Sequence, residues 1–380
     1  MARISATLSS ELARDVYPIA RSGSKKRAVN LLKDNYGNAI VLLESSLFKG
    51  KTGGPAGIKI STGFGCVVLG NNKQHKGRAF IVFRGTKLLA DWLSNFNIAP
   101  ARSESGYSVH DGFNAAFHSM KPQLMELVNL AKKQGATSFH CIGHSLGGAL
   151  ATLCANWLQN RGESTYLYTY GSPRVGLNDF STYLTTQMTT KRIYRVFHKT
   201  DVVPMIPTWP YVHIPDSGTD YWLHSPGIVP GAKYHDMDEY CLSADGKAWN
   251  TLAGNRQAHK SDLSIQQWLM QKTRATFSME TLQWLQSAIV FVVKKISSVA
   301  GSYDKFTVLD HLAYVLAKGI NLAEKLSRWV KYFIHKVMEV LGLKPSPHET
   351  IFSKSFIRDL LGRLERKVYQ SVDSALRYEM

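Results

Sequence analysis

The sequence has few cysteines and no long apolar stretch. The first feature argues against a zinc or redox site, and the second argues against a membrane span. Its 380 residues include only Cys66, Cys141, Cys154 and Cys241. None of these forms a Cys-x-x-Cys pair, so we expect free thiols rather than a zinc or redox site. A membrane-spanning helix needs about 20 apolar residues, and the most apolar piece, residues 288–293, is far shorter. A membrane span is therefore not expected.

The first 30 residues lack the apolar core of a signal peptide. Charged residues such as Arg14, Asp15 and Arg21 interrupt this segment, so export by the ordinary signal-peptide route is not expected. The segment predicts a cytoplasmic or peripheral membrane location, or secretion by a machine that does not use a signal peptide.

Acidic residues are scarce relative to basic ones. The chain has 28 Asp and Glu against 46 Lys and Arg, which gives a net charge of +18. Such an excess favours an anionic partner, either a nucleic acid or an anionic membrane surface. No nucleic-acid-binding motif is present, so we expect no nucleic-acid partner.

Two regions of different character follow one another along the chain. Up to about residue 250, short apolar runs alternate with helical patterns, which predicts an α/β fold with a mostly parallel central sheet. The expected strands cover residues 64–69, 78–83, 139–142, 166–170 and 193–197, and the expected helices cover 118–133 and 146–159. We therefore expect an α/β domain over residues 1–254.

Long helical patterns dominate after about residue 255. They cover residues 281–299 and 312–341, and a last basic helix begins at about Ser353. Aromatic and basic residues mix in the longer pattern, for example Trp329 and Phe333 beside Lys331. Residues 255–380 are thus expected to form a helical, basic, amphipathic region that docks on a membrane or on the first domain, although helices packed in a bundle give the same stripe.

The strongest chemical signal is Gly143-His144-Ser145-Leu146-Gly147, a Gly-x-Ser-x-Gly motif. It follows an expected strand and opens an expected helix, as a nucleophile elbow does. The sharp turn holds the serine hydroxyl out from the sheet edge, and the helix N-terminus offers backbone N–H groups to a developing oxyanion. The motif predicts a serine nucleophile at Ser145.

A serine nucleophile needs a histidine to take its proton and a carboxylate to orient that histidine. Asp201 follows the expected strand at residues 193–197, and catalytic groups of such sheets gather at the carboxyl ends of strands. A turn-forming Asp would look the same. Position in the chain does not choose among the histidines that follow, which include His213, His224, His235, His259 and His311.

Several motifs in the same order resemble those of the class 3, or fungal-type, lipases, whose fold is an α/β-hydrolase. The resemblance covers about residues 10–245, and the motifs together are highly specific. The matching segments are Phe83-Arg84-Gly85-Thr86, Asp91-Trp92-Leu93-Ser94-Asn95-Phe96, Val109-His110-Asp111-Gly112-Phe113, Gly143 to Gly148, Tyr170 to Gly176, and Asp201-Val202-Val203-Pro204.

The resemblance assigns a role to each matching position. It implies Ser145 as nucleophile and Asp201 as the orienting acid, with the N–H groups of Thr86 and Leu146 as the oxyanion hole. His235 lies in His235-Asp236-Met237-Asp238-Glu239-Tyr240, which resembles the element around the family's catalytic histidine. His259 is the alternative base, because its separation from Asp201 is closer to that of the fungal members.

The resemblance also implies a lid that carries Leu88, Leu89, Trp92 and Leu93. If residues 87–96 are helical, these side chains form an apolar face that covers the site in water and moves onto lipid. An ordinary buried loop helix gives the same pattern.

A lipase of this kind hydrolyses acyl esters and implies no metal or cofactor. The basic excess favours a phospholipase A-type activity on glycerophospholipids at an anionic membrane surface. The alternatives are a soluble carboxylesterase or triacylglycerol lipase and, in another class, a non-catalytic lipid-binding hydrolase fold. If the protein is an effector delivered by a specialised secretion machine, an immunity-type inhibitor protein in the producing cell is expected.

Overall fold

The computed structural model describes residues 3–22, 24–53, 59–86, 100–216, 220–226, 233–253, 260–297, 308–322, 324–344 and 352–377. The strands of its central sheet are β1 (Ile40–Gly53), β2 (Lys59–Gly70), β3 (Arg78–Phe83), β6 (Ser138–His144), β7 (Thr165–Tyr170), β8 (Ile193–His198) and β9 (Tyr221–Leu223). The short strands β4 (Pro100–Arg102) and β5 (Ser108–His110) form a separate ribbon.

The central sheet is mostly parallel, as the sequence predicts. Its strand order is β1-β2-β3-β6-β7-β8-β9. The pairs β1–β2 and β2–β3 are antiparallel, whereas β3, β6, β7, β8 and β9 run parallel to one another. The fold is an α/β-hydrolase fold, and the carboxyl ends of its parallel strands lie along one edge of the sheet.

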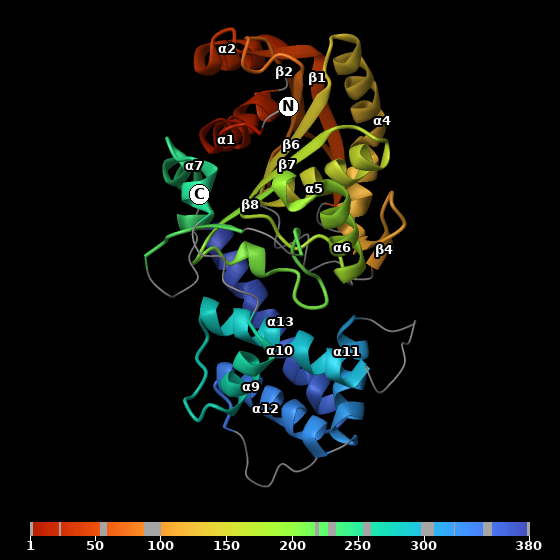
Figure 1. Ribbon diagram of the computed structural model, residues 1–380, viewed down its shortest axis with the longest axis vertical. Helices are drawn as coiled ribbons and strands as arrows, with labels where there is room; N and C mark the ends of the chain where they lie inside the picture. Colours follow the sequence, from red (N-terminus) through yellow and green to blue (C-terminus); the bar gives the residue numbers. More distant parts are fainter. Residues whose placement is uncertain are drawn as a thin grey trace.

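Helices cover both faces of the sheet (Figure 1). One face carries α1 (Ala6–Ser22), α2 (Lys25–Tyr36), α7 (Met237–Ala244) and α8 (Trp249–Leu252), and the other carries α4 (Asp111–Lys133), α5 (Leu146–Asn160) and α6 (Asn178–Met188). Successive residues of a strand point to opposite faces of the sheet. Leu167 of β7 belongs to the hydrophobic core that includes α4 and α5, whereas Tyr168 belongs to the core that includes α1. The sheet is thus buried on both faces, as parallel sheets are.

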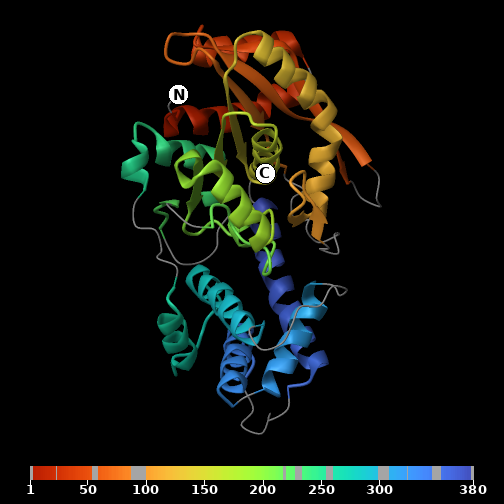
Figure 2. The same ribbon diagram turned by 45° about the vertical axis from the view of Figure 1, so that its right-hand side comes forward.

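A group of helices follows the sheet in the chain. It consists of α9 (Asp262–Met270), α10 (Met279–Ser297), α11 (Val308–Ile320), α12 (Glu324–Val340) and α13 (Lys354–Arg377). Figures 1 and 2 show these helices packed together below the sheet, with α13 running back toward it. Among the described helices, none is both long and apolar enough to cross a membrane.

The structure corrects one expected helix. The pattern over residues 312–341 predicts a single helix, but α11 ends at Ile320 and α12 begins at Glu324. Gly319 gives a physical reason, because glycine weakens a helix interior, and the turn that follows includes a hydrogen bond from Asn321 N–H to the Lys318 carbonyl. The break lets α11 and α12 pack against each other.

Trp329 and Phe333 are 7% and 2% exposed, so they lie inside the group of helices. The expected division of the chain after residue 254 stays a prediction.

Candidate active site

Ser145 lies at the tight turn between β6 and α5. Its backbone has φ 55° and ψ −130°, a strained conformation for a residue other than glycine. A Cβ added to Gly143 would lie 2.1 Å from the Gly147 carbonyl oxygen, and one added to Gly147 would lie 2.2 Å from that of Phe83. Both flanking glycines are therefore required for strand and helix to approach so closely. This is the geometry of a nucleophile elbow.

Asp201 and His235 meet at the carboxyl-end edge of the sheet. Asp201 follows β8, and His235 ends the 3-10 turn η4 (Lys233–His235). The His235 Nδ1 atom lies 2.8 Å from Asp201 Oδ2, and both residues are 1% exposed. A carboxylate at Nδ1 orients the imidazole and leaves Nε2 to act on a substrate proton.

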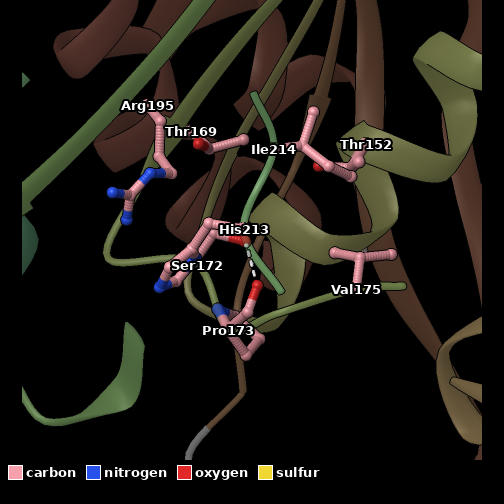
Figure 3. Close-up of a pocket in the computed structure, with 8 residues that line it drawn as sticks. All are labelled: Thr152, Thr169, Ser172, Pro173, Val175, Arg195, His213 and Ile214. Atoms are coloured by element: carbon pink, nitrogen blue, oxygen red, sulfur yellow. Dashed lines mark hydrogen bonds between the residues drawn. The ribbon is translucent and has the colours of Figure 1, made fainter. Parts of the chain in front are cut away.

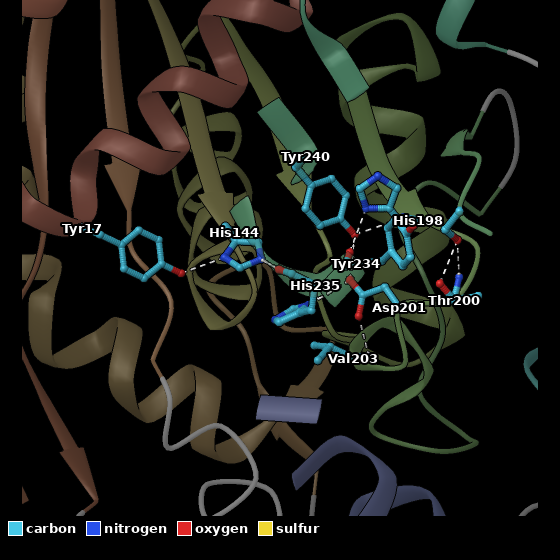
Figure 4. A network of polar contacts seen from close by, with 10 residues as sticks. Tyr17, His144, His198, Thr200, Asp201, Val203, Tyr234, His235 and Tyr240 are labelled. Atoms are coloured by element: carbon cyan, nitrogen blue, oxygen red, sulfur yellow. Dashed lines mark hydrogen bonds and ion pairs between the residues drawn. The ribbon is translucent and has the colours of Figure 1, made fainter. Parts of the chain in front are cut away.

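The Asp201 carboxylate is held by two further donors (Figure 4). The Tyr240 hydroxyl donates to Oδ2 over 2.7 Å, and the Val203 N–H donates to Oδ1 over 2.9 Å. The pKa of Tyr240 is raised well above its usual value, first by burial and then by the Asp201 charge, so this hydroxyl keeps its proton. These bonds hold the Asp201 carboxylate in one position, and the carboxylate in turn holds the His235 ring in one orientation.

His235 also lies against the nucleophile elbow. Its ring centroid is 4.6 Å from that of His144, the residue before Ser145. The Ser145 Oγ atom is buried and has no hydrogen-bond partner within the described part of the chain. The His235–Asp201 pair therefore lies beside the turn that carries Ser145.

The expected oxyanion donors flank Ser145 on two sides. Leu146 is the first residue of α5, and its N–H belongs to the open N-terminus of that helix. Thr86 follows Gly85, and a Cβ on Gly85 would lie 3.0 Å from the Ser145 Cβ. The end of β3 is therefore packed against the nucleophile, which places the next residue beside the same site.

Two sets of expected residues lie outside the described residues. They are the lid residues Leu88, Leu89, Trp92 and Leu93, and the alternative base His259. Of the two candidate bases, the described structure therefore places His235 beside Asp201.

A small cavity lies behind the segment that follows β7 (Figure 3). Its volume is about 10 Å³, and it is lined by Thr152, Thr169, Ser172, Pro173, Val175, Arg195, His213 and Ile214. That volume suits at most one water molecule. The pKa of His213 is lowered well below its usual value by burial and by the nearby Arg195 and Arg174. His213 therefore stays neutral in this structural cavity, which is too small for an acyl chain.

The C-terminal helix α13 reaches the same edge of the sheet. It contacts η4, which carries His235, and the blue ribbon of α13 passes below His235 and Val203 in Figure 4. Val368 and Val372 are 2% and 0% exposed, and the Thr208 hydroxyl donates to Glu365 over 3.4 Å. Part of the apolar face of α13 is thus buried against the α/β part of the chain.

The arrangement agrees with comparisons with known proteins. Residues 80–211, which include the elbow and Asp201, match the family model "Lipase (class 3)". This part of the chain is similar to the class 3 lipase family. This confirms the resemblance inferred from the motifs, and it covers the part of the chain that carries Ser145.

Three relatives illustrate the family. Secreted mono- and diacylglycerol lipase 1 of Fusarium solani is 38% identical over 167 residues, which are 43% of this chain and 48% of that protein. The lipase of Rhizomucor miehei is 33% identical over 162 residues, 40% and 43% of the two chains. Phospholipase A1-II 1 of Oryza sativa subsp. indica is 29% identical over 218 residues, 48% and 54% of the two chains. The chain spans about half the length of these curated relatives.

Sequence reasoning missed several residues that support this candidate site. Tyr240 lies in the segment used to choose His235, but its bond to Asp201 was not foreseen. Tyr17 of α1 and His144 also contact the site (Figure 4). Tyr17 belongs to no recognised motif, so only its place in the fold reveals it.

Proposed function

We propose that this chain is a serine hydrolase that cleaves carboxylic acyl esters of lipids. The observation that carries the proposal is the 2.8 Å contact of His235 Nδ1 with Asp201 Oδ2, beside the elbow that presents Ser145. This arrangement supports Ser145 as nucleophile, His235 as base and Asp201 as the orienting acid, with His259 as the alternative base.

The reaction proceeds through an acyl-enzyme. His235 Nε2 takes the proton of the Ser145 hydroxyl as Oγ attacks the ester carbonyl carbon. The negative charge that develops on the carbonyl oxygen is stabilised by the N–H groups of Thr86 and Leu146. When the ester C–O bond breaks, His235 returns the proton to the leaving alcohol. A water molecule then loses a proton to His235 and attacks the acyl carbon. When the bond from the acyl carbon to Ser145 Oγ breaks, His235 returns that proton to Oγ, and the fatty acid is released.

Burial supports this chemistry. Ser145, Asp201 and His235 are 2%, 1% and 1% exposed, and hydrogen bonds and charges act more strongly where water is excluded. The same burial requires that substrate reach the site by a movement of covering segments. The lid proposed for residues 87–96 is one such segment.

Within this class we propose a phospholipase A-type activity on glycerophospholipids. The net charge of +18 supports it, because a basic protein concentrates at anionic lipid surfaces. The similarity to a rice protein named phospholipase A1-II 1 is a second support. The similarity to a mono- and diacylglycerol lipase supports the alternative of a neutral-lipid substrate.

The proposal includes a division of the chain after residue 254 into a lipase domain and a helical region. Attachment to membranes, secretion without a signal peptide and an inhibitor protein stay predictions from the sequence.

The test is hydrolysis of a panel of esters, with identification of the products. The panel contains a soluble short-chain ester, a triacylglycerol emulsion, and vesicles of phosphatidylglycerol or phosphatidylcholine. We expect release of fatty acid and lysophospholipid, fastest on phosphatidylglycerol, and no release by Ser145→Ala. Faster release from the triacylglycerol favours the neutral-lipid alternative, and activity on the short-chain ester alone favours a carboxylesterase.

A fluorophosphonate probe separates an enzyme from a lipid-binding fold. The probe should label wild type at Ser145 and leave Ser145→Ala unlabelled. A folded wild-type protein that binds vesicles but neither reacts with the probe nor hydrolyses any ester would contradict the proposal.

A further inference from the structure

A tyrosine from the N-terminal helix reaches the site from the opposite side to Asp201. The Tyr17 hydroxyl accepts a hydrogen bond from the Gly85 N–H over 3.0 Å and lies 2.7 Å from His144 Nδ1. Gly85 immediately precedes Thr86, and His144 immediately precedes Ser145. One hydroxyl thus joins the oxyanion segment to the nucleophile turn, and Figure 4 shows its bond to His144.

His144 extends this chain of contacts to the catalytic base. Its Nε2 atom lies 2.7 Å from the backbone carbonyl oxygen of His235, 91 residues away in the sequence. A carbonyl oxygen only accepts hydrogen bonds, so Nε2 carries the proton and donates. Burial, followed by the proximity of His235, lowers the pKa of His144 well below its usual value. His144 is therefore neutral, and its unprotonated Nδ1 accepts from the Tyr17 hydroxyl.

The helix that carries Tyr17 is itself fixed to the sheet. The Ile4 N–H donates to the Tyr168 hydroxyl over 3.1 Å, and the hydroxyls of Ser9 and Tyr170 are 2.7 Å apart. Both tyrosines belong to β7, whose last residue, Tyr170, accepts the Ser145 N–H through its carbonyl over 2.9 Å. Tyr17 therefore projects from a support that is anchored beside the nucleophile.

We propose that Tyr17 and His144 are positioning residues, which hold the oxyanion segment and the His235 backbone in register with Ser145. This inference rests on the proposed function. Within the described residues, neither side chain is hydrogen-bonded to Ser145 Oγ or His235 Nε2. Tyr17 and His144 therefore act through Gly85 and through the backbone and ring of His235. The His235 carbonyl selects the tautomer of His144 in which Nε2 donates, and the Tyr17 hydroxyl donates to Nδ1 on the other side of the ring.

Loss of the Tyr17 hydroxyl has two consequences in this arrangement. The Gly85 N–H loses its acceptor, and His144 Nδ1 loses its donor. The oxyanion segment is then no longer joined to the His144 ring, and that ring is held only by the bond from Nε2 to the His235 carbonyl. Displacement of catalytic groups by about 1 Å costs about a hundredfold in rate, so we expect kcat to fall between tenfold and a hundredfold.

The experiment measures kcat and KM on a soluble short-chain ester for Tyr17→Phe. Tyr36→Phe is the matched control, because it removes a tyrosine hydroxyl that also holds α1, through a 2.8 Å bond to Asp15, but lies outside the site. We expect Tyr17→Phe to lower kcat at least tenfold with KM unchanged, and Tyr36→Phe to lower stability without lowering kcat. Unfolding in guanidinium chloride measures the stability of each variant, so a loss of kcat is distinguished from a loss of stability.

A pair of substitutions at His144 tests the donor and acceptor pattern. His144→Gln keeps an N–H donor and an oxygen acceptor on one side chain, whereas His144→Leu removes both. We expect His144→Gln to retain most of kcat and His144→Leu to lose at least tenfold.

Full kcat in Tyr17→Phe, or an equal loss in Tyr36→Phe, overturns the inference. Equal kcat in His144→Gln and His144→Leu overturns it as well. Wild type that hydrolyses no ester overturns the proposed function together with this inference, so the two failures are distinguishable.

Discussion

The Tyr240 hydroxyl donates a 2.7 Å hydrogen bond to Oδ2 of Asp201. That oxygen also lies 2.8 Å from His235 Nδ1, so one carboxylate atom is bonded to both the imidazole and a neutral phenol. Tyr240 accepts in turn from the His198 N–H over 3.1 Å, which ties the arrangement to the end of β8. The phenol therefore orients the Asp201 carboxylate independently of His235.

Tyr240→Phe should lower kcat about tenfold on a soluble ester with KM unchanged. A hydrogen bond to a charged group contributes about 1.5–3 kcal/mol, and part of it is recovered when Asp201 relaxes toward His235. Steady-state kinetics at several pH values measure the effect. Tyr194→Phe is the control, because its hydroxyl donates to a backbone carbonyl, that of Lys191, over 2.8 Å. Equal kcat values in the two variants would show that Tyr240 only packs.

Substitutions of the two candidate histidines should have different effects. His235→Ala should lose as much activity as Ser145→Ala, because members of a triad act as a unit and their losses do not add. His259→Ala should retain most activity. Asp201→Asn should lose about 10⁴-fold in kcat, as the corresponding serine-protease change does, because the histidine takes the wrong tautomer. The decisive measurement is single-turnover acylation, and an inactive His259→Ala beside an active His235→Ala would reverse the assignment of the base.

The strands that carry the candidate site could be predicted from the sequence, because buried parallel strands appear in a sequence as short apolar runs. The run at residues 78–83 and the motif at Ser145 fall on β3 and on the β6–α5 turn. Helices α1 and α2 were not predicted. Their polar partners, such as Asp15 with Asn35 and Tyr36, are 20 and 21 residues apart and show no local periodicity. Tyr17 was missed for the same reason, because its partners come from distant strands.

A buried histidine makes the fold sensitive to acid. His140 of β6 is stacked on Tyr166 with ring centroids 4.8 Å apart, and within the described residues its ring nitrogens have no hydrogen-bond partner. Burial, with a smaller effect of Arg78, lowers its pKa from 6.5 to about 3. Below pH 6.5 the unfolded chain binds a proton that the folded chain does not, so the free energy of unfolding falls as the pH falls toward 3.

His140→Leu should remove this dependence. Each pH unit between the two pKa values corresponds to about 1.4 kcal/mol, so the variant should gain about 2 kcal/mol relative to wild type when the pH falls from 7.5 to 5. Guanidinium chloride unfolding at both pH values measures the gain. His224→Leu is the control, because it makes the same substitution at an exposed histidine. Parallel stability curves for wild type and His140→Leu would contradict the prediction.

The helices after residue 260 belong to the region that we predict to dock on a lipid surface. Residues 251–380 contain 19 basic and 11 acidic residues. Lys336, a basic residue of the helical pattern over residues 312–341, is 3% exposed and donates to the carbonyls of Gln271 and Thr273. Lys294, Lys325 and Arg366 are exposed. The predicted attraction to an anionic surface therefore rests on such exposed cations rather than on the buried stripe.

Charge reversal tests this attraction without deleting α13, which packs against the segment that carries His235. Lys294→Glu, Lys325→Glu and Arg366→Glu together should weaken binding to phosphatidylglycerol vesicles at least tenfold, since each basic residue near such a surface contributes about 1 kcal/mol. The matched control reverses Lys25, Lys26 and Arg27, which are exposed on α2 at the opposite end of the molecule (Figure 1).

Vesicle sedimentation in 50 and 300 mM salt measures binding, and wild-type binding should weaken in the higher salt because exposed charges are screened. Both triple variants should hydrolyse a soluble ester at the wild-type rate. An equal loss of binding in both would mean that only net charge matters, and full binding by the first variant would exclude these helices as the docking surface.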